Sequence, residues 1–407
     1  MDFEDSPAEA AFRAESVEWL EEHAKRRDGA AEMWATLRTH TDDADRAAMA
    51  SAKLWQALKA DAGFAGIQWP VSDGGRGLSP QLAGVFKTEE SHFDVPANAF
   101  QVGVDMVGPT LIAHGTDEQR ARHLDPIRRG DEVWCQLFSE PGAGSDLAGL
   151  AMRADRDGDH FVVNGQKVWT SGAHYADWGI LLVRTDSSVP KHRGITFLLI
   201  DMASPGLEVR PLRQIDGAIH FNEVFLTDVH VPVANAVGEV GGGWGVAMTT
   251  LENERSAIGG GGMVQFPEIL MLAREMGRTD EPVIRQKLAE LHTIFQITRF
   301  LNHRVQTSIS NGRPPGSESS VMKLHISRQY EFGSDLIEEI MGAAGTLMGE
   351  DAPFDGFFQG VFMAQWAPRI GGGTDQVQRN VVGERVLGLP PEARPDKSVP
   401  FRELPHS

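Results

Sequence analysis

The spacing of hydrophobic residues changes twice along this chain. Up to about residue 130, apolar residues recur every three or four positions among charged ones, which predicts amphipathic helices, most clearly over residues 8–22 and 47–60. From about residue 245 the same spacing returns and predicts long helices over residues 282–307 and 321–341. Helices near both ends of the chain therefore flank a part with a different period.

That middle part has the pattern of β-strands. After Gly130, short runs rich in valine, isoleucine and phenylalanine are separated by turn residues. Asn164-Gly165 lies between two such runs, where an Asn-Gly pair favours a tight hairpin turn. Further strands are expected over residues 180–184, 195–200, 207–212 and 219–231, which together predict an antiparallel sheet.

These patterns predict an α+β multi-domain protein. We expect an N-terminal α-helical domain over residues 1–130, a middle β-sheet domain over 131–235 and a C-terminal α-helical domain over 236–393. A tail over 394–407 follows, and its proline and charge content predicts little fixed structure. Thr116 fits the N-cap of an N-terminal helix, and Thr374 fits the N-cap of a C-terminal helix that ends before Gly388-Leu389-Pro390.

Composition and charge exclude several classes of function. The chain has 38 Lys and Arg against 57 Asp and Glu, and its net charge of −19 argues against binding to nucleic acid or an anionic membrane. Its single cysteine, Cys135, excludes an intrachain disulfide, and its scattered histidines predict no metal site. We find no signal peptide and no apolar run of membrane-spanning length, so we expect a cytoplasmic protein.

A candidate ligand loop begins the β part. The sequence WCQLFSEPGAGSD over residues 134–146 combines a proline, two glycines and the hydroxyls of Ser139 and Ser145. Such a loop offers backbone N–H groups and short donors to a polar, flat or phosphorylated ligand. It lacks the third glycine of the dinucleotide fingerprint. A surface turn with no ligand is the alternative interpretation.

Six separate motifs, in the family's order, resemble the acyl-CoA dehydrogenase family, and the likeness covers nearly the whole chain. It implies that family's fold, with an N-terminal helical domain, a middle antiparallel β domain and a C-terminal four-helix bundle. The motifs are the loop over residues 70–77, GTDEQ over 115–119, FSEPGAGSD over 138–146, KVWTS over 167–171, IMGAAG over 340–345 and GGTDQVQR over 372–379.

The resemblance implies FAD as the cofactor and an acyl-CoA thioester as the substrate. FAD needs an aromatic wall and polar donors, and Trp169 would supply the wall. Without the family frame, Trp169 could equally be a core aromatic of the sheet. By position in the motifs, the backbone of Phe138 with Ser139, Trp169, Ser171, Thr374 and Gln376 would contact FAD, and Ser145 would contact the pantetheine arm.

The reaction implied by the resemblance removes a proton from Cα while hydride leaves Cβ for flavin N5. A carboxylate in a desolvated pocket suits the proton transfer. The position that carries the base in most of the family is Gly372 here, so we predict that the base is Glu254, as in the branch with a Glu-Arg pair on an earlier helix. Arg255 would support the site and the N–H of Gly372 would donate to the thioester carbonyl. The alternative is a solvated Glu254–Arg255 charge pair.

Three further features affect the predicted site. Four glycines over residues 259–262 are unfavourable in a helix and predict either an enlarged acyl pocket for a bulky or branched group or a local break between helices. The family's pyrophosphate-binding arginine on the loop after this helix matches Arg274 only loosely. Glu339 replaces the family's usual glutamine, and an anion is a poor neighbour for a pyrophosphate.

Three functions remain open. The first is an FAD-dependent dehydrogenase of lipid metabolism, as in β-oxidation, that acts as a homodimer or homotetramer and passes electrons to an electron-transfer flavoprotein. The second is one subunit of a heteromeric dehydrogenase whose partner chain completes the flavin site. The third is a nonredox protein that binds acyl-CoA. Colour after purification, with and without a partner chain, would distinguish them.

Overall fold

The computed structural model describes residues 5–27, 42–258, 264–310, 318–393, 396 and 398–404. These residues form two compact units. The first takes its described residues from Met1–Thr41, Lys87–Asp94 and Ile258–Glu392, and the second from Asp42–Phe86, Val95–Ala257 and Ala393–Ser407. The chain passes between the units several times, so neither unit is one continuous stretch of sequence.

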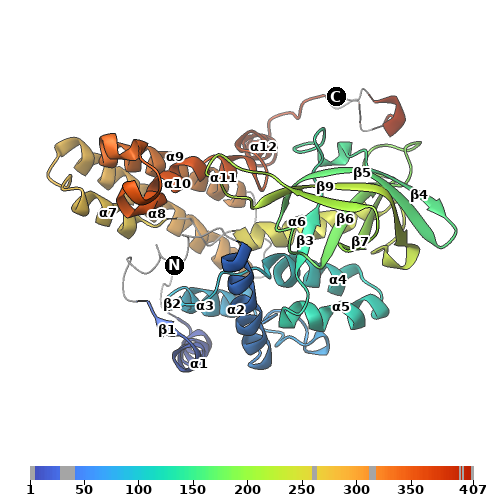
Figure 1. Cartoon of the computed structure of the whole chain (residues 1–407), viewed down its shortest axis with the longest axis horizontal. Coiled ribbons are helices and arrows are strands. Elements are labelled where there is room, and N and C mark those ends of the chain that lie inside the picture. Colours follow the sequence, from blue (N-terminus) through green and yellow to red (C-terminus); the bar gives the residue numbers. More distant parts are fainter. Residues whose placement is uncertain are drawn as a thin grey trace. The chain divides into compact units, whose positions relative to one another are not determined.

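Along the chain, helices precede and follow the strands, which confirms the predicted α+β order (Figure 1). The N-terminal part contains α1 (Pro7–His23), β1 (Lys25–Arg26), α2 (Asp42–Asp61), α3 (Pro80–Glu90), β2 (Phe93–Asp94), α4 (Gly108–His114) and α5 (Asp117–Arg129). The strands that follow are β3 (Trp134–Leu137), β4 (Arg153–Asp157), β5 (His160–Ser171), β6 (Trp178–Arg184), β7 (Ile195–Asp201), β8 (Leu207–Pro211) and β9 (Phe221–Pro232). The C-terminal part contains α6 (Gly243–Ile258), α7 (Phe266–Glu275), α8 (Pro282–Ser310), α9 (Glu318–Met341), α10 (Phe357–Ala364), α11 (Ala367–Ile370) and α12 (Asp375–Val381).

The N-cap predicted at Thr116 is confirmed. The backbone N–H of Gln119 donates to Thr116 Oγ1 at 3.2 Å, and the N–H of Thr116 donates to Gln119 Oε1 at 3.1 Å. This reciprocal capping box satisfies two of the N–H groups that the first turn of α5 leaves without helical partners.

The sheet of the second unit has the strand order β3-β6-β4-β5-β9-β8, and β7 pairs with β6. Most neighbours are antiparallel, as predicted. The exception is β6, whose first four residues run parallel to the whole of β3 and whose last residue, Arg184, pairs in parallel with β4. This parallel pairing follows from the long connection between β3 and β6, which contains the candidate loop and two other strands.

The predicted hairpin turn at Asn164-Gly165 is wrong. β5 continues through both residues, and the turn between β4 and β5 lies instead at Gly158, which has a φ of 60°. Asn164 Nδ2 donates to Asp228 Oδ1 at 3.0 Å across to β9, and Gly165 has a φ of 150° at a register shift. The pair therefore forms a bulge in a long strand, a role that the same residue types also favour.

Alternate residues of the central strands enter two different cores. Leu182 and Phe197 belong to a core shared with helices α4, α5 and α6, which Figure 1 shows beside the sheet. Leu181 and Leu198, their neighbours in sequence, enter the core enclosed by the sheet itself. Both faces of β6 and β7 are buried, which explains why these strands are continuous apolar runs rather than alternating ones.

The first unit contains the C-terminal helices from α7 to α12, whereas α6 belongs to the second unit. Helices α7, α8, α9 and α10 share one core that includes Leu272, Leu291, Ile337 and Phe358. This agrees with the four-helix bundle that the family resemblance implies. The short strands β1 and β2 pair antiparallel in the same unit. Within the described part of the chain, no helix combines the length and the apolar composition needed to cross a membrane.

The prediction that the tail has little fixed structure is wrong for residues 398–404. A 3₁₀ turn, Phe401–Glu403, forms part of the second unit, and the side chain of Phe401 is only 6% exposed. Proline and charge content predicted a segment without fixed structure. The burial of one large aromatic side chain, Phe401, is enough to order this short segment.

We expect Cys135 to be unreactive in the native protein. Its side chain is fully buried, its Sγ lies 3.7 Å from Met202 Sδ, and burial raises the pKa of its thiol well above the usual range. A maleimide should label it at least about a hundredfold more slowly than it labels the guanidinium-denatured chain. Equal labelling rates before and after denaturation would contradict this packing.

Candidate active site

Residues 134–137 of the candidate ligand loop form strand β3, so the loop itself covers residues 138–146, and its start is hydrogen-bonded to β5. Phe138 is buried and Ser139 is half-buried. The backbone N–H of Val168 donates to the carbonyl of Ser139 at 2.9 Å, and Lys167 Nζ donates to the carbonyl of Phe138 at 3.0 Å. These bonds bring the FSEPGAGSD and KVWTS motifs together.

A buried ion pair holds the same loop from inside. Lys167 is 0% exposed and Glu140 is 9% exposed, and Lys167 Nζ lies 2.7 Å from Glu140 Oε1. The two carboxylate oxygens of Glu140 also accept the N–H groups of Ala151 at 2.7 Å and Met152 at 3.0 Å. Burial lowers the pKa of Lys167, and the charge and hydrogen bond of Glu140 act against that shift. Glu140 thus ties the loop to two segments that follow it in the chain, residues 151–152 and strand β5.

Trp169 is the most unusual residue of the site. It lies at a register shift between β5 and β9, its φ is +62°, and its side chain is 60% exposed. A positive φ in a bulky residue costs about 1–3 kcal/mol and persists only where the surroundings impose it. The ring packs edge-on against Phe221 with centroids 5.8 Å apart. Ser171, two residues later on β5, and Ser145 of the ligand loop are both exposed. The core-aromatic interpretation of Trp169 is therefore wrong.

Glu254 lies on α6, half-buried, within the same unit as the loop. Gln136 Nε2 donates to Glu254 Oε2 at 3.4 Å, and Gln136 is two residues before Phe138 on β3. The predicted base and the predicted flavin loop are thus neighbours in this structure. Arg255 belongs to α6, but its side chain and residues 259–262 are outside the described residues.

The other predicted site residues belong to the first unit. Thr374 caps α12 as predicted, because the N–H of Val377 donates to its Oγ1 at 3.1 Å. Gly372 is exposed with a φ of 61°, and its carbonyl accepts Gln378 Nε2 at 3.3 Å. Gln376 is exposed in the first turn of α12. Exposed residues at a helix N-terminus can bind anionic or acceptor groups.

The arginine of the loop after α7 is Arg278 in this structure. Arg274 lies in the last turn of α7 with an exposed side chain, so in this structure it is on a helix and not on a loop. Arg278 pairs with Glu281 and donates to the carbonyl of Glu339 at 3.3 Å. The carboxylate of Glu339 is paired with Lys287, which offsets the charge that made this position unfavourable for a phosphate.

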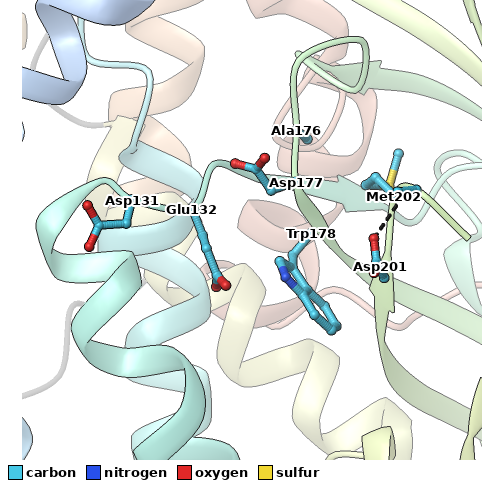
Figure 2. Close-up of a pocket in the computed structure, with 8 residues that line it drawn as sticks. Asp131, Glu132, Ala176, Asp177, Trp178, Asp201 and Met202 are labelled. Carbon is cyan, nitrogen blue, oxygen red and sulfur yellow. Dashed lines mark hydrogen bonds between the residues drawn. The ribbon is translucent and has the colours of Figure 1, made fainter.

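A pocket of about 400 Å³ opens in the second unit and contains none of the predicted site residues. Figure 2 shows carboxylates arranged near Trp178. These carboxylates have structural partners, since Arg122 lies 2.7 Å from Glu132 and the N–H of Val133 donates to Asp177 at 2.8 Å. The pocket is lined by Asp131, Glu132, Ala176, Asp177, Trp178, Asp201, Met202 and Ala203. Among the described residues, no three His, Cys, Asp or Glu side chains converge as metal ligands.

Comparison with known proteins identifies the family. The acyl-CoA dehydrogenase N-terminal, middle and C-terminal domain models match residues 20–131, 135–229 and 241–387. The acyl-CoA dehydrogenase IpdE1 of Mycobacterium tuberculosis is 36% identical over 387 residues, which are 94% of this chain and 98% of the relative. The chain belongs to the acyl-CoA dehydrogenase family. It is therefore an oxidoreductase of a family of FAD-dependent flavoproteins.

Two solved structures resemble the fold of this chain closely. The Tcur3481-Tcur3483 steroid acyl-CoA dehydrogenase has a TM-score of 0.80 at 30% identity, covering 96% of this chain and 100% of that chain. The ChsE4-ChsE5 complex of Mycobacterium tuberculosis has a TM-score of 0.76 at 30% identity, with the same coverage. The fold and family predicted from the sequence motifs are confirmed.

Some residues of the acyl-CoA dehydrogenase site carry no role in the sequence-based prediction. Gln136 contacts the predicted base, Lys167 and Glu140 hold the loop, and Lys191 binds Asp146 at its end. Lys167 gave a usable signal, because a lysine in an apolar strand must find a partner when it is buried. Gln136 and Lys191 gave none, since their partners are distant in sequence.

Proposed function

We propose that this protein oxidises an acyl-CoA thioester to the α,β-unsaturated ester, with FAD as the hydride acceptor and Glu254 as the base. One arrangement carries the proposal: an exposed Trp169 on strained backbone beside a hydroxyl-bearing loop, with Glu254 joined by Gln136 to the strand that begins the loop. Strained backbone and exposed aromatic side chains are costly without a ligand, and they cluster at functional sites.

The residues present fit FAD. Trp169 offers an exposed aromatic surface for a flat ring. Short polar groups are offered by Ser139 on the ligand loop and by Ser171 on β5, the strand of Trp169. FAD, when bound, would accept the hydride that leaves Cβ. Thr374 and Gln376 at the start of α12, with an arginine of the α7 region, would bind other parts of the cofactor. Arg274, exposed in the last turn of α7, is the arginine predicted for this role, and Arg278 lies on the loop that follows α7.

Glu254 would take the proton from Cα as the hydride leaves Cβ, so that two C–H bonds break and one C=C bond forms. A positioned carboxylate is the fitting group for this transfer. The N–H of Gly372 would stabilise the negative charge that develops on the thioester carbonyl, and Ser145 would hold the pantetheine arm. Arg255, beside the base in sequence, would support the site electrostatically.

The proposed acyl group is bulky or branched, and polycyclic groups are included. Four glycines at residues 259–262 supply no side-chain volume to the segment that lines the acyl pocket in this family. A solved structure at 30% identity is described as a steroid acyl-CoA dehydrogenase, which supports the same substrate class. A preference for short straight acyl chains would contradict this part of the proposal.

Two assemblies are compatible with the proposal. The protein could act as a homo-oligomer that passes electrons to an electron-transfer flavoprotein. The second candidate is a heteromeric enzyme with a related subunit, favoured because the similar ChsE4-ChsE5 structure is a complex of two named chains.

Purification with an absorbance spectrum tests the cofactor and the assembly together. We expect a yellow protein with about one FAD per chain, either alone or after coexpression with a related dehydrogenase subunit from the same organism. Colour without coexpression favours the homo-oligomer, and colour only after coexpression favours the heteromer. A colourless protein in both preparations that still binds CoA esters would contradict the dehydrogenase proposal and favour a nonredox acyl-CoA-binding role.

A further inference from the structure

The C-terminal segment is connected to the candidate ligand loop through two buried side chains, Arg184 and Lys191. We define the strap as Asp396 with residues 398–404. The N–H of Phe401 donates to the carbonyl of Val189 at 2.9 Å, and the N–H of Arg402 donates to the carbonyl of Ser187 at 3.0 Å. These bonds attach the strap to the connection between β6 and β7.

The ring of Phe401 lies 3.9 Å from the guanidinium carbon of Arg184, measured to the ring centroid. Arg184 is buried, and its guanidinium donates to the carbonyls of Lys191 at 2.7 Å, Ala148 at 2.7 Å and Leu150 at 3.1 Å. Burial lowers the pKa of Arg184 to about 10. The strap therefore covers a cation that organises both the β6–β7 connection and the residues directly after the ligand loop.

Lys191 joins the strap to the loop directly. Its side chain is 9% exposed, and its Nζ contacts Asp146 Oδ1 at 2.9 Å and Oδ2 at 2.8 Å. The same Nζ forms an ion pair with Asp396 of the strap. Burial acts to lower the pKa of Lys191, but the hydrogen bonds with Asp146 and Asp396 outweigh it and raise that pKa. Lys191 is thus charged and held between loop and strap.

We propose that Lys191 is a positioning residue for the ligand loop over residues 138–146 and that the strap holds Lys191 and Arg184 in place. Two contacts of the strap act on the chain near the end of the loop. Asp396 pairs with Lys191, which binds Asp146. Phe401 contacts Arg184, which donates to the carbonyl of Ala148. A glycine-containing loop has many accessible conformations, so each fixed end reduces the entropy lost when a ligand binds.

The consequence for the enzyme rests on the proposed function. If Ser145 holds the pantetheine arm, a loosened loop binds the CoA ester more weakly but leaves the proton and hydride transfers intact. Loss of the strap contact should therefore raise KM for the CoA ester and leave kcat almost unchanged. A residue that only supports the fold would lower the amount of active protein and leave KM unchanged.

Hydrogen exchange of the purified full-length protein tests the proposal without substrate. Lys191→Met and Phe401→Ala should each speed exchange of the amides at residues 142–147 by about three- to tenfold, because local opening becomes easier. The double variant should show less than the product of the two effects, since both act on one connection. Arg193→Met and Glu403→Ala, which alter exposed side chains of the same two segments, are the matched controls and should leave the loop unchanged.

Unchanged loop exchange in Lys191→Met would overturn the proposal, as would a Phe401→Ala effect confined to the strap. Lys191→Met alone suffices if Phe401→Ala fails to fold. In steady state, Lys191→Met should raise KM for the CoA ester by about three- to tenfold, with kcat within twofold of wild type. Faster loop exchange with an unchanged KM would refute the role in substrate binding. Faster exchange in a protein that oxidises no CoA ester would leave the loop connection standing and refute the proposed function instead.

Discussion

Replacing Glu254 with glutamine should slow reduction of the bound flavin by an acyl-CoA ester by about 10²- to 10⁴-fold. A positioned general base contributes an acceleration of this order, and an amide cannot accept the Cα proton. Glutamine has the shape of glutamate and can keep a hydrogen bond with Gln136, whose Nε2 lies 3.4 Å from the carboxylate. Anaerobic rapid mixing that follows flavin absorbance measures this rate directly.

Glu252→Gln is the matched control for this prediction. Glu252 is exposed and two residues earlier on α6, so its replacement removes the same charge from the same helix. We expect its rate of flavin reduction to stay within about twofold of wild type. A Glu254→Gln variant that reduces its flavin at the wild-type rate would refute the role of Glu254 and favour the solvated charge pair.

Replacing Lys167 with methionine should destabilise the second unit by about 3–5 kcal/mol. Breaking a buried ion pair from one side leaves the other charge buried without its counter-ion. Here the charge left behind is that of Glu140, which is 9% exposed and keeps hydrogen bonds with the N–H groups of Ala151 and Met152. Denaturant unfolding followed by tryptophan fluorescence measures the change.

Lys287→Met provides the comparison for an exposed pair. Lys287 and Glu339 are 40% and 35% exposed, so water screens their attraction. Loss of this pair should cost less than about 1 kcal/mol. Similar losses of unfolding free energy in Lys167→Met and Lys287→Met would show that the buried Lys167–Glu140 pair stabilises the fold no more than an exposed pair does.

The sequence predicted correctly those helices and caps that depend on residues close together in the chain. The threonine caps at α5 and α12 were recognisable because the capping oxygen and the N–H that it accepts are three residues apart. The long helices α8 and α9 followed from hydrophobic spacing. The hairpin prediction failed because Asn-Gly favours both a turn and a bulge, and pairing of Asn164 with Asp228 of β9 decides between them.

The residues of the candidate site could be predicted only where they belong to a motif of the family. FSEPGAGSD and KVWTS are separated by 20 residues, and the Lys167–Glu140 pair that joins them could be expected from burial but not assigned from spacing. The strap and Lys191 were missed because their contacts join segments distant in sequence. The exposed ring of Trp169 depends on a bulge between β5 and β9, which no local pattern specifies.

The central claim is that this chain, with FAD bound, oxidises a bulky acyl-CoA ester. Anaerobic titration of the purified flavoprotein with a panel of CoA esters, from short straight chains to branched and polycyclic groups, tests it most directly. We predict stoichiometric bleaching of the flavin by bulky esters and slower or no bleaching by short straight ones. An FAD-loaded protein, prepared alone or with a partner subunit, that no ester of the panel bleaches would contradict the account.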